Sequence, residues 1–225
     1  MSYVWLSYPI GMNDPRPPAI PAPELKDFLT IWRDGASVQM LKIANHTGTH
    51  LDTAGHVIEN GILITEFRPE DLIFNCIAVI DMHMVDAGIV KPEHLKPHYD
   101  RLIRCDMVMF RFGSGRIRFE DPGRYSQRSP GFGVDAAAWL REKCTGLRCI
   151  GIDTPSIATI AYLDETMPAH NILLEGNERR FLIIEEMNLD QNLNNLKEVR
   201  VNPWMVSGMN SGPCSVIGVM FEKIG

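Results

Sequence analysis

The sequence lacks the features that mark a membrane protein or a nucleic-acid-binding protein. None of its apolar runs approaches the length of about 18 residues that crosses a bilayer. Its start, MSYVWLSYPIGMNDP, has no basic stretch, and its apolar stretch is too short and mixed for a signal peptide. The chain has no run rich in lysine and arginine, and its formal net charge is -6, which gives no basic field to attract nucleic acid. We therefore expect neither a membrane nor a nucleic acid among its partners.

Cysteine is sparse and shows no pattern. The five cysteines are odd in number, scattered along the chain and without C-x-x-C spacing. This distribution argues against a disulfide framework and against a zinc site built from thiolates, and it favours reduced thiols. We expect a cytoplasmic protein.

The order of apolar and polar residues predicts one domain over residues 1–225 with a mostly β core. Alternating or continuous apolar residues predict strands at 37–45, 76–82, 106–113, 147–153, 181–188 and 213–221. The clearest helix is predicted over 133–146, and 91–103 has the length of a helix that Pro97 interrupts. Strands outnumber helices and the two are mixed along the chain, so we expect the α+β class.

Three segments have a less regular pattern. Residues 14–23, DPRPPAIPAP, contain five prolines and are expected to be extended. Residues 24–35 fit either a short helix or an irregular segment. Residues 115–133 are rich in Arg, Gly, Ser and Pro and are expected to form a long loop. The arginines of RFGSGRIRFEDPGR could bind a substrate carboxylate in bidentate fashion, although a solvated loop is the simpler interpretation.

The stretch HTGTHLDTAGH, residues 46–56, contains three of the seven histidines together with an aspartate. Imidazole and carboxylate groups are the usual ligands of zinc and similar divalent ions. His46 and His50 have the spacing of an H-E-x-x-H metalloprotease helix, but the Thr-Gly-Thr spacer lacks the glutamate and disfavours a helix. On a helix, Asp52 would lie about 200° around the axis from His50. The motif is therefore predicted to lie on an extended or looped backbone.

On an extended chain His46, His50, Asp52 and His56 would all project to one side. The first three would supply the roughly three protein ligands of a catalytic zinc site, which keeps one position for water. His56 would remain beside the metal, and an imidazole with its ordinary pKa of about 6.5 is suited to moving protons at neutral pH. Gly48 would let the chain bend between the ligands.

A histidine taken alone is more often a core or surface residue than a ligand. Four ligand-type residues within eleven positions favour a metal site over that simpler interpretation. His83, His94 and His98 each occur singly, and we expect them to be structural or surface residues.

The run His46-x-Gly48-Thr49-His50-x-Asp52-x-x-x-His56 resembles the signature of the metal-dependent cyclase family, which includes bacterial kynurenine formamidase (arylformamidase) and isatin hydrolase. A second cue is GIDTPS at residues 151–156, which is followed by a histidine and then by IIEEMNL. The similarity extends from LSYPI near the N-terminus to SGPCSVIGV near the C-terminus, which is nearly the whole chain.

The resemblance implies a swivelling β/β/α fold, a homodimer or homotetramer, and one or two divalent metal ions. Zinc is the expected metal, with manganese as the alternative. The implied roles are a first metal ion bound by His46, His50 and Asp52, a second bound by Asp52, His170 and Glu185 with Glu185 bridging, and His56 as general acid/base. Glu186 follows Glu185 in the predicted strand and would point to the opposite face, so the choice between them rests on the matched motif.

The implied activity is hydrolysis of a non-peptide C–N bond in a small amide. Arylformamidase does this when it converts N-formylkynurenine to kynurenine in tryptophan catabolism. The chain departs from the family pattern at Ala54, where proline is common, and in DPRPPAIPAP, which lacks the aromatic residue that contacts the substrate ring in formylkynurenine-cleaving members. The second departure argues against aromatic formamide specificity but leaves the hydrolytic residues in place. A ring-closing or dehydrating reaction and a non-catalytic metal site are the alternatives.

Overall fold

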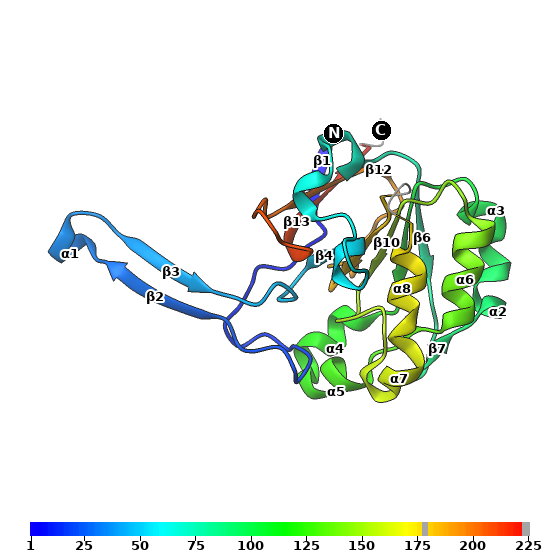
Figure 1. Ribbon diagram of the computed structural model, residues 1–225, viewed down its shortest axis with the longest axis horizontal. Helices are drawn as coiled ribbons and strands as arrows, with labels where there is room; N and C mark the ends of the chain where they lie inside the picture. Colours follow the sequence, from blue (N-terminus) through cyan, green and yellow to red (C-terminus); the bar gives the residue numbers. More distant parts are fainter. Residues whose placement is uncertain (177–179, 222–225) are drawn as a thin grey trace.

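The computed structural model describes residues 1–176 and 180–221, and its centre is a nine-stranded sheet (Figure 1). The strands run in the order β5-β12-β13-β4-β11-β10-β8-β6, with β1 paired to β13. Their bounds are β1 (Ser2–Trp5), β4 (His50–Asp52), β5 (Ile73–Phe74), β6 (Ile77–Asp81), β8 (Met107–Arg111), β10 (Cys149–Ile152), β11 (Leu182–Glu185), β12 (Leu196–Pro203) and β13 (Ser211–Met220). Strand β6 contacts β12, so the two ends of the sheet approach each other and the sheet is nearly closed.

The half of the sheet formed by β6, β8, β10 and β11 is parallel. A parallel strand is covered on both faces, so its sequence is a continuous apolar run rather than an alternating one. Residues 107–110, 149–152 and 182–184 follow this pattern, and all of them are buried. The strands predicted over 76–82, 106–113, 147–153 and 181–188 are confirmed.

Helices lie beside the parallel half of the sheet, on the right in Figure 1, where α6 packs against α8. The helices of the body are α2 (Pro92–Leu95), α3 (Tyr99–Leu102), α4 (Ser114–Glu120), α5 (Pro122–Arg128), α6 (Val134–Lys143), α7 (Leu163–Thr166) and α8 (Pro168–Leu174). Helix α6 confirms the helix predicted over 133–146. Pro97 lies in a 3-10 turn that separates α2 from α3. The predicted α+β class with a mostly β core is confirmed.

The long loop predicted over residues 115–133 is wrong, because the segment forms α4 and α5 and ends in the short strand β9 (Gly131–Phe132), which pairs with β7 (Ile89–Val90). Asp121 follows α4 and caps α5, since its carboxylate accepts a hydrogen bond from the Arg124 backbone N–H at 3.0 Å. Pro122 occupies the first turn of α5, where a missing N–H costs no helical hydrogen bond. These two helix-start signals outweigh the loop-like composition around them.

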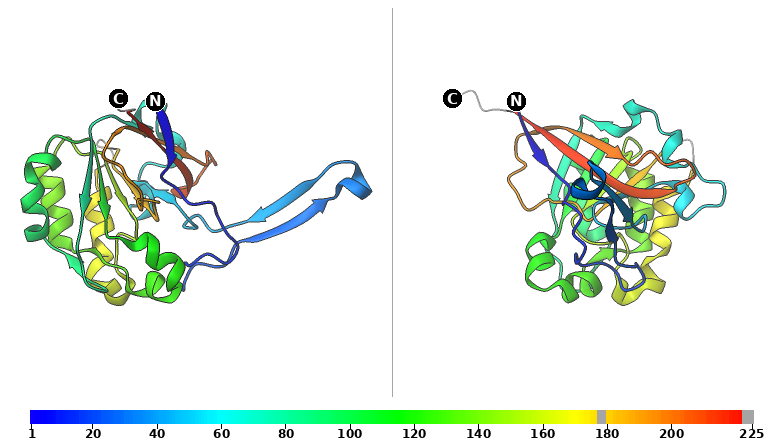
Figure 2. Two further views of the ribbon diagram at one scale, coloured as in Figure 1. Left: turned by 180° about the vertical axis from the view of Figure 1, so that it is seen from behind. Right: turned by 90° about the vertical axis from the view of Figure 1, so that its left-hand side faces the viewer.

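Residues 24–42 form a hairpin that projects from the body (Figures 1 and 2). Strand β2 (Glu24–Leu29) pairs antiparallel with β3 (Val38–Lys42), and α1 (Ile31–Asp34), a single turn, joins them at the tip. The strand predicted over 37–45 is confirmed, and the segment 24–35 combines a strand with one turn of helix. None of the residues of these three elements is buried, so the hairpin adds nothing to the core of the body.

Disulfides and membrane-spanning helices are both missing from the residues that the structure describes. All five cysteines are free, and only Cys76 is exposed. No helix in the described ranges has both the length and the apolar character needed to cross a bilayer.

The tight packing around β9 can be tested at Gly131. A Cβ at this position would lie against the backbone nitrogen of Thr159 and 2.7 Å from the carbonyl carbon of Ala158. Overpacking of this kind typically costs about 1–3 kcal/mol, so Gly131→Ala should lower the free energy of unfolding by roughly 2 kcal/mol in a urea titration. The control is Gly123→Ala on α5, where the nearest atom to a new Cβ is 3.7 Å away and stability should stay the same or rise slightly. Equal stability of the two variants would contradict the packing described.

Candidate metal centre

Strand β4 crosses the middle of the sheet and carries two of the predicted ligands. His50 and Asp52 are two residues apart on this strand, so their side chains point to the same face. Strand β11 pairs antiparallel with β4, and the register places Glu185 directly opposite His50. Residues in opposite positions share a face, so Glu185 joins His50 and Asp52. All three are buried, and the most exposed of them, Glu185, is 3% accessible.

A turn before β4 brings His46 back over the strand. Gly48 has φ of +64°, a left-handed conformation that favours glycine, as the predicted bend requires. The ring centroid of His46 thereby lies 5.0 Å from that of His50. Its Nδ1 atom is 3.3 Å from Oδ1 of Asp52.

His56 ends a 3-10 turn, Ala54–His56, that directly follows β4. The hydroxyl of Thr53 donates a hydrogen bond of 2.6 Å to a backbone carbonyl and so anchors the start of the turn. The ring centroid of His56 lies 4.4 Å from that of His46 and 5.8 Å from that of His170. His56 therefore faces the same space as the predicted ligands on β4.

Helix α8 supplies His170 from a distant part of the sequence. The Nε2 atom of His170 lies 3.3 Å from Oε1 of Glu185, and Nε2 of His50 lies 3.2 Å from Oε2 of the same carboxylate. The backbone N–H of Ile157, directly after the GIDTPS segment, donates to Oε1 at 2.6 Å. The carboxylate of Glu185 is thus held between two imidazoles.

Glu185 faces the histidines and Glu186 does not. The carboxylate of Glu186 points to Arg118, whose Nε and Nη2 donate to its Oε1 at 2.9 and 2.8 Å. The two carboxylates therefore point in different directions, although β11 ends at Glu185 and Glu186 lies in the turn that follows it, with φ of +56°. The metal-binding role assigned to Glu185 stays a prediction, and the carboxylate of Glu186 already has a partner.

Several buried polar atoms of the cluster form no hydrogen bond of regular geometry: Nε2 of His50, both carboxylate oxygens of Asp52, and Nδ1 of His170. Two of these atoms lie at ion-pair distance from another candidate ligand, Nε2 of His50 at 3.2 Å from Glu185 and Oδ1 of Asp52 at 3.3 Å from His46. Nδ1 of His50 lies 2.8 Å from the carbonyl of Gly48, so this nitrogen carries the proton and Nε2 faces the carboxylates. Buried polar atoms without partners are rare in folded proteins. Imidazole and carboxylate atoms that converge in this way are the donors that a divalent metal ion requires, so the residues fit such an ion.

The ligand-type atoms fall into two groups that share one carboxylate. The groups are His46, Asp52 and His56, and His50, Asp52 and Glu185, each with its ligand atoms within 4.8 Å of one another. The set predicted for a first metal ion is therefore divided between the two groups. His56, predicted to be the acid/base, lies in the same group as His46. Two groups with a shared Asp52 are compatible with one or two ions.

Burial and mutual contact shift the pKa values of these residues. Burial alone would raise the pKa of Asp52, but the neighbouring imidazoles hold it well below its usual range. For Glu185, burial is likewise opposed by the imidazoles of His170 and His50, and the pKa is lowered to about 2. Burial would lower the pKa of His50, but the carboxylates of Glu185 and Asp52 raise it to about 9. Without a metal ion, His50 therefore holds an additional proton at neutral pH.

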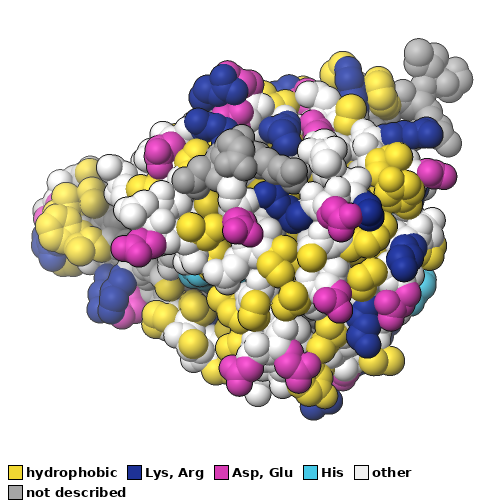
Figure 3. All heavy atoms as spheres, turned by 45° about the vertical axis from the view of Figure 1, so that its right-hand side comes forward, with side chains coloured by type: hydrophobic (Ala, Val, Ile, Leu, Met, Phe, Trp, Pro, Cys, Tyr) yellow, Lys and Arg dark blue, Asp and Glu magenta, His cyan; other side chains and the backbone are white. Residues whose placement is uncertain are grey.

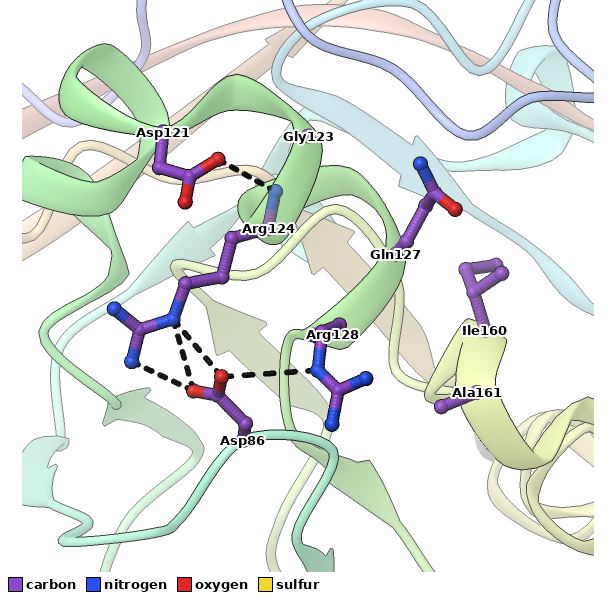
Figure 4. A pocket seen from close by; sticks show the side chains of 8 residues that line it. All are labelled: Asp86, Asp121, Gly123, Arg124, Gln127, Arg128, Ile160 and Ala161. Carbon is purple, nitrogen blue, oxygen red and sulfur yellow. Dashed lines mark hydrogen bonds and ion pairs between the residues drawn. The ribbon is translucent and has the colours of Figure 1, made fainter.

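The arginines of the segment RFGSGRIRFEDPGR face carboxylates of the protein itself. In Figure 4, Arg124 of α5 points toward Asp86 with nitrogen–oxygen distances of 2.7–3.0 Å, and Arg128, which follows the segment on the same helix, lies 3.7 Å from the same carboxylate. Arg118 is buried and paired with Glu186. The charges of these arginines are already compensated, which argues against the binding of a substrate carboxylate. The pairing of Arg118 with Glu186 was missed in the sequence because it joins positions 68 residues apart and leaves no local pattern.

The family described as "Putative cyclase" matches residues 4–159, well over half of the chain. The chain belongs to the cyclase family. The resemblance inferred from the histidine motif is therefore confirmed. The match contains the motif at residues 46–56 but ends before His170 and Glu185, whose place in the site rests on the geometry above.

Named relatives extend this likeness. Cyclase-like protein 2 of Arabidopsis thaliana is 28% identical over 184 residues, which are 79% of this chain and 63% of the relative. Kynurenine formamidase of Salinibacter ruber is 30% identical over 145 residues, 63% of each protein. The matched region thus spans less than two thirds of the length of these two relatives.

Solved structures share the fold over nearly the whole chain. Isatin hydrolase A from Labrenzia aggregata has a TM-score of 0.81 at 20% identity, and the match covers 98% of this chain and 94% of that one. A protein described as a potential metal-dependent hydrolase with cyclase activity has a TM-score of 0.74 at 21% identity, with 98% of both chains covered. The swivelling β/β/α fold of the cyclase family is therefore the fold of this chain.

Zinc is expected to stabilise the protein, and more strongly as the pH rises. The pKa of His50 is raised to about 9 in the metal-free protein, so at lower pH a metal ion must displace its proton and binds more weakly. Zinc at about 100 times its Kd would add about 2.7 kcal/mol to the stability of the fold. Thermal unfolding with and without zinc at pH values from about 6 to about 8 should show a rise in Tm that grows with pH. The rise should vanish in His50→Ala and persist in the control His83→Ala, an exposed histidine outside the cluster. A wild-type Tm that zinc leaves unchanged at every pH would contradict a metal site.

Proposed function

We propose that this protein is a metal-dependent hydrolase that cleaves a C–N bond other than a peptide bond in a small amide. The observation that carries the proposal is the buried set of imidazole and carboxylate atoms without hydrogen-bond partners, which fits a divalent ion. Membership of the cyclase family supports it, since relatives carry the names kynurenine formamidase and isatin hydrolase. Zinc is the proposed ion and manganese the alternative, because both accept nitrogen and oxygen ligands.

The chemistry divides between the ion and the chain. A divalent ion, when bound, supplies hydroxide at neutral pH and polarises a carbonyl group. The buried carboxylates of Asp52 and Glu185 supply the negative charge that holds it, and the carbonyl of Gly48 fixes the tautomer of His50. Burial of β4 and β11 keeps bulk water away from these ligands.

His56 is proposed as the group that moves the proton. It is partly exposed at the cluster, and burial lowers its pKa below the usual value of histidine, so its imidazole is neutral at neutral pH. A neutral imidazole can accept a proton from the attacking water and pass it to the departing nitrogen. A C–O bond forms as the C–N bond breaks, and the products are a carboxylate and an amine. Because His56 also lies beside His46 and Asp52, a ligand role is the competing assignment.

The two assignments of His56 give different results in one variant. If His56 moves the proton, His56→Ala should lower kcat on an aryl formamide or a lactam by about 100- to 10,000-fold with zinc content unchanged. Turnover measured together with elemental mass spectrometry tests this, with His98→Ala, outside the cluster, as the control. Loss of zinc in His56→Ala would identify a ligand, and near-full turnover would refute the proton-transfer role.

The alternative functions are separated by chelation. A structural zinc site is normally closed by four protein ligands, and its removal unfolds the domain. Chelation that abolishes amide hydrolysis while the circular dichroism spectrum is unchanged would support the hydrolase. Unfolding on chelation, without turnover of formamides or lactams, would support a non-catalytic metal site. A ring-closing or dehydrating enzyme would retain its fold on chelation. It would not hydrolyse these amides even with the metal ion bound.

We also propose a homodimer whose interface includes the hairpin 24–42. The hairpin exposes seven large apolar side chains, and Trp32 at its tip is 84% exposed. They are Leu25, Phe28, Ile31, Trp32, Val38, Met40 and Leu41. Apolar side chains also cover the end of the arm at the left in Figure 3. A two-stranded hairpin is marginally stable alone, and an apolar patch of this kind marks an interaction surface.

Charge and area favour a second copy of this chain as the partner. The hairpin has three acidic and three basic residues, so it is neutral and approaches an acidic body without repulsion. Its charges are paired internally, Glu24 with Lys26 and Lys42, and Arg33 with Asp34. In a two-fold dimer both arms are used. An aromatic side chain buries about 150–250 Å², so Phe28 and Trp32 of the two arms together bury on the order of 600 Å². The surface that they cover on the partner adds a similar area, and the total exceeds the roughly 1,000 Å² that a specific interface requires.

The dimer is tested by the double variant Ile31→Ser, Trp32→Ser at the tip of the hairpin. Light scattering coupled to size-exclusion chromatography should show a dimer for the wild type and a monomer for the variant, because the interface loses the two most exposed apolar side chains of the hairpin. The control Val85→Ser replaces a side chain that is 78% exposed outside the hairpin and should remain a dimer. A monomeric wild type, or a dimeric tip variant, would contradict the assembly.

We propose the cytoplasm as the location of the protein, because its five free thiols are typical of a reducing compartment.

A further inference from the structure

Arg118 on α4 is a buried charge that lies outside the cluster of metal-ligand candidates. Its side chain is 2% exposed, and its guanidinium group donates to Oε1 of Glu186 through Nε and Nη2 at 2.9 and 2.8 Å. Nη2 also donates to Oδ2 of Asp14 at 2.8 Å, and the group stacks 4.4 Å above the ring of Tyr8. A buried charge is tolerated only when it is paired in this way. Neither the ligand cluster nor the proposed proton transfer uses this pair.

Glu186 is held at three points in a backbone conformation that glutamate rarely adopts. Its φ is +56°, in the left-handed region, which for a residue with a long side chain persists only where its surroundings impose it. Its backbone N–H donates to the carbonyl of Thr154 at 2.8 Å, and its own carbonyl accepts from the hydroxyl of Thr49 at 2.6 Å. Arg118 holds the third point, the carboxylate.

Glu186 is the sequence neighbour of one ligand candidate, Glu185, and contacts the sequence neighbour of another, His50. Glu186 follows Glu185 at the end of β11, and Thr49, which it contacts, precedes His50 on β4. The hydroxyl of Thr49 also accepts a hydrogen bond from the backbone N–H of Tyr8 at 3.0 Å. The contacts of Glu186 therefore fix the chain at the point where β4 and β11 present His50 and Glu185 to each other.

We infer that Arg118 is a positioning residue for metal binding, acting through Glu186 on Glu185 and His50. The inference rests on the proposed metal site. Without the guanidinium group the carboxylate of Glu186 is buried without a partner, and the left-handed turn loses one of the three contacts that hold it. The Glu185 carboxylate then shifts relative to His50 and His170, because the peptide that follows it turns differently.

The test is the zinc affinity of Arg118→Met, measured by competition with a chromophoric chelator. Groups that orient metal ligands typically contribute about 10- to 100-fold to metal affinity, so the Kd for zinc should rise by this factor. The matched control is Arg116→Met on the same helix, which removes an exposed arginine paired with Glu120 and should leave the Kd unchanged. Arg118→Lys, which keeps the charge but cannot form the same fork of hydrogen bonds, should fall between the wild type and Arg118→Met.

A second variant separates positioning from a general effect on folding. Arg118→Met combined with Glu186→Met removes both buried charges, so it should recover thermal stability while zinc affinity stays weak. A double variant as stable as the wild type and with wild-type zinc affinity would overturn the inference, as would an unchanged Kd in folded Arg118→Met. If the wild-type protein binds no zinc, the proposed function is overturned and the inference falls with it. The titration of the wild type alone distinguishes this outcome from a failure of the inference.

Discussion

The burial of two carboxylates, Asp52 and Glu185, where β4 meets β11, is the constraint on which the centre of the structure depends. Buried charges cost several kcal/mol each unless they are compensated. Histidines from a turn, a strand, a 3-10 turn and a helix converge on these carboxylates. Even so, neither oxygen of Asp52 forms a hydrogen bond of regular geometry, and its contact with Nδ1 of His46 is 3.3 Å long. A divalent cation bound here would neutralise the part of the carboxylates' negative charge that the histidines leave uncompensated.

The sheet topology explains why the candidate ligands come from a short segment and two distant ones. Strand β4 has only three residues, and it lies between the parallel strands that end in β11 and the long antiparallel strand β13. Its position at the centre buries His50 and Asp52, while the turns on either side carry His46 and His56 to the same face. Pairing with β11 adds Glu185 through register alone. The site is thus a consequence of where one short strand lies in the sheet.

The local part of this arrangement could be predicted from the sequence, and the distant part could not. The glycine at position 48 and the i, i+2 spacing of His50 and Asp52 predict a bend and a shared face, and both are present. Strand alternation also predicted different directions for Glu185 and Glu186, but Glu186 lies just past the end of β11 with φ of +56°, so its direction is set by the turn and not by the strand. The resemblance to the cyclase family, rather than any spacing, pointed to His170, because a helix and a strand separated in sequence meet only through tertiary packing.

Two errors have local causes. The loop expected over 115–133 was inferred from composition, whereas Asp121 and Pro122 start a helix by capping and by fixed backbone geometry. Residues 24–35, the first part of the hairpin, gave an ambiguous pattern between a short helix and an irregular segment, because their apolar residues occur on both faces and none is buried within the chain. Apolar periodicity indicates structure only when one face meets a core, and this hairpin has no core of its own.

The central claim, that these side chains hold a metal ion, is tested most directly by anomalous X-ray scattering at the zinc edge from crystals grown with zinc. We predict an anomalous peak at roughly 2.0–2.2 Å from Nε2 of His50 and from oxygens of Asp52 and Glu185. Zinc-loaded crystals in which this position has no peak, while the side chains keep the arrangement described, would contradict the claim.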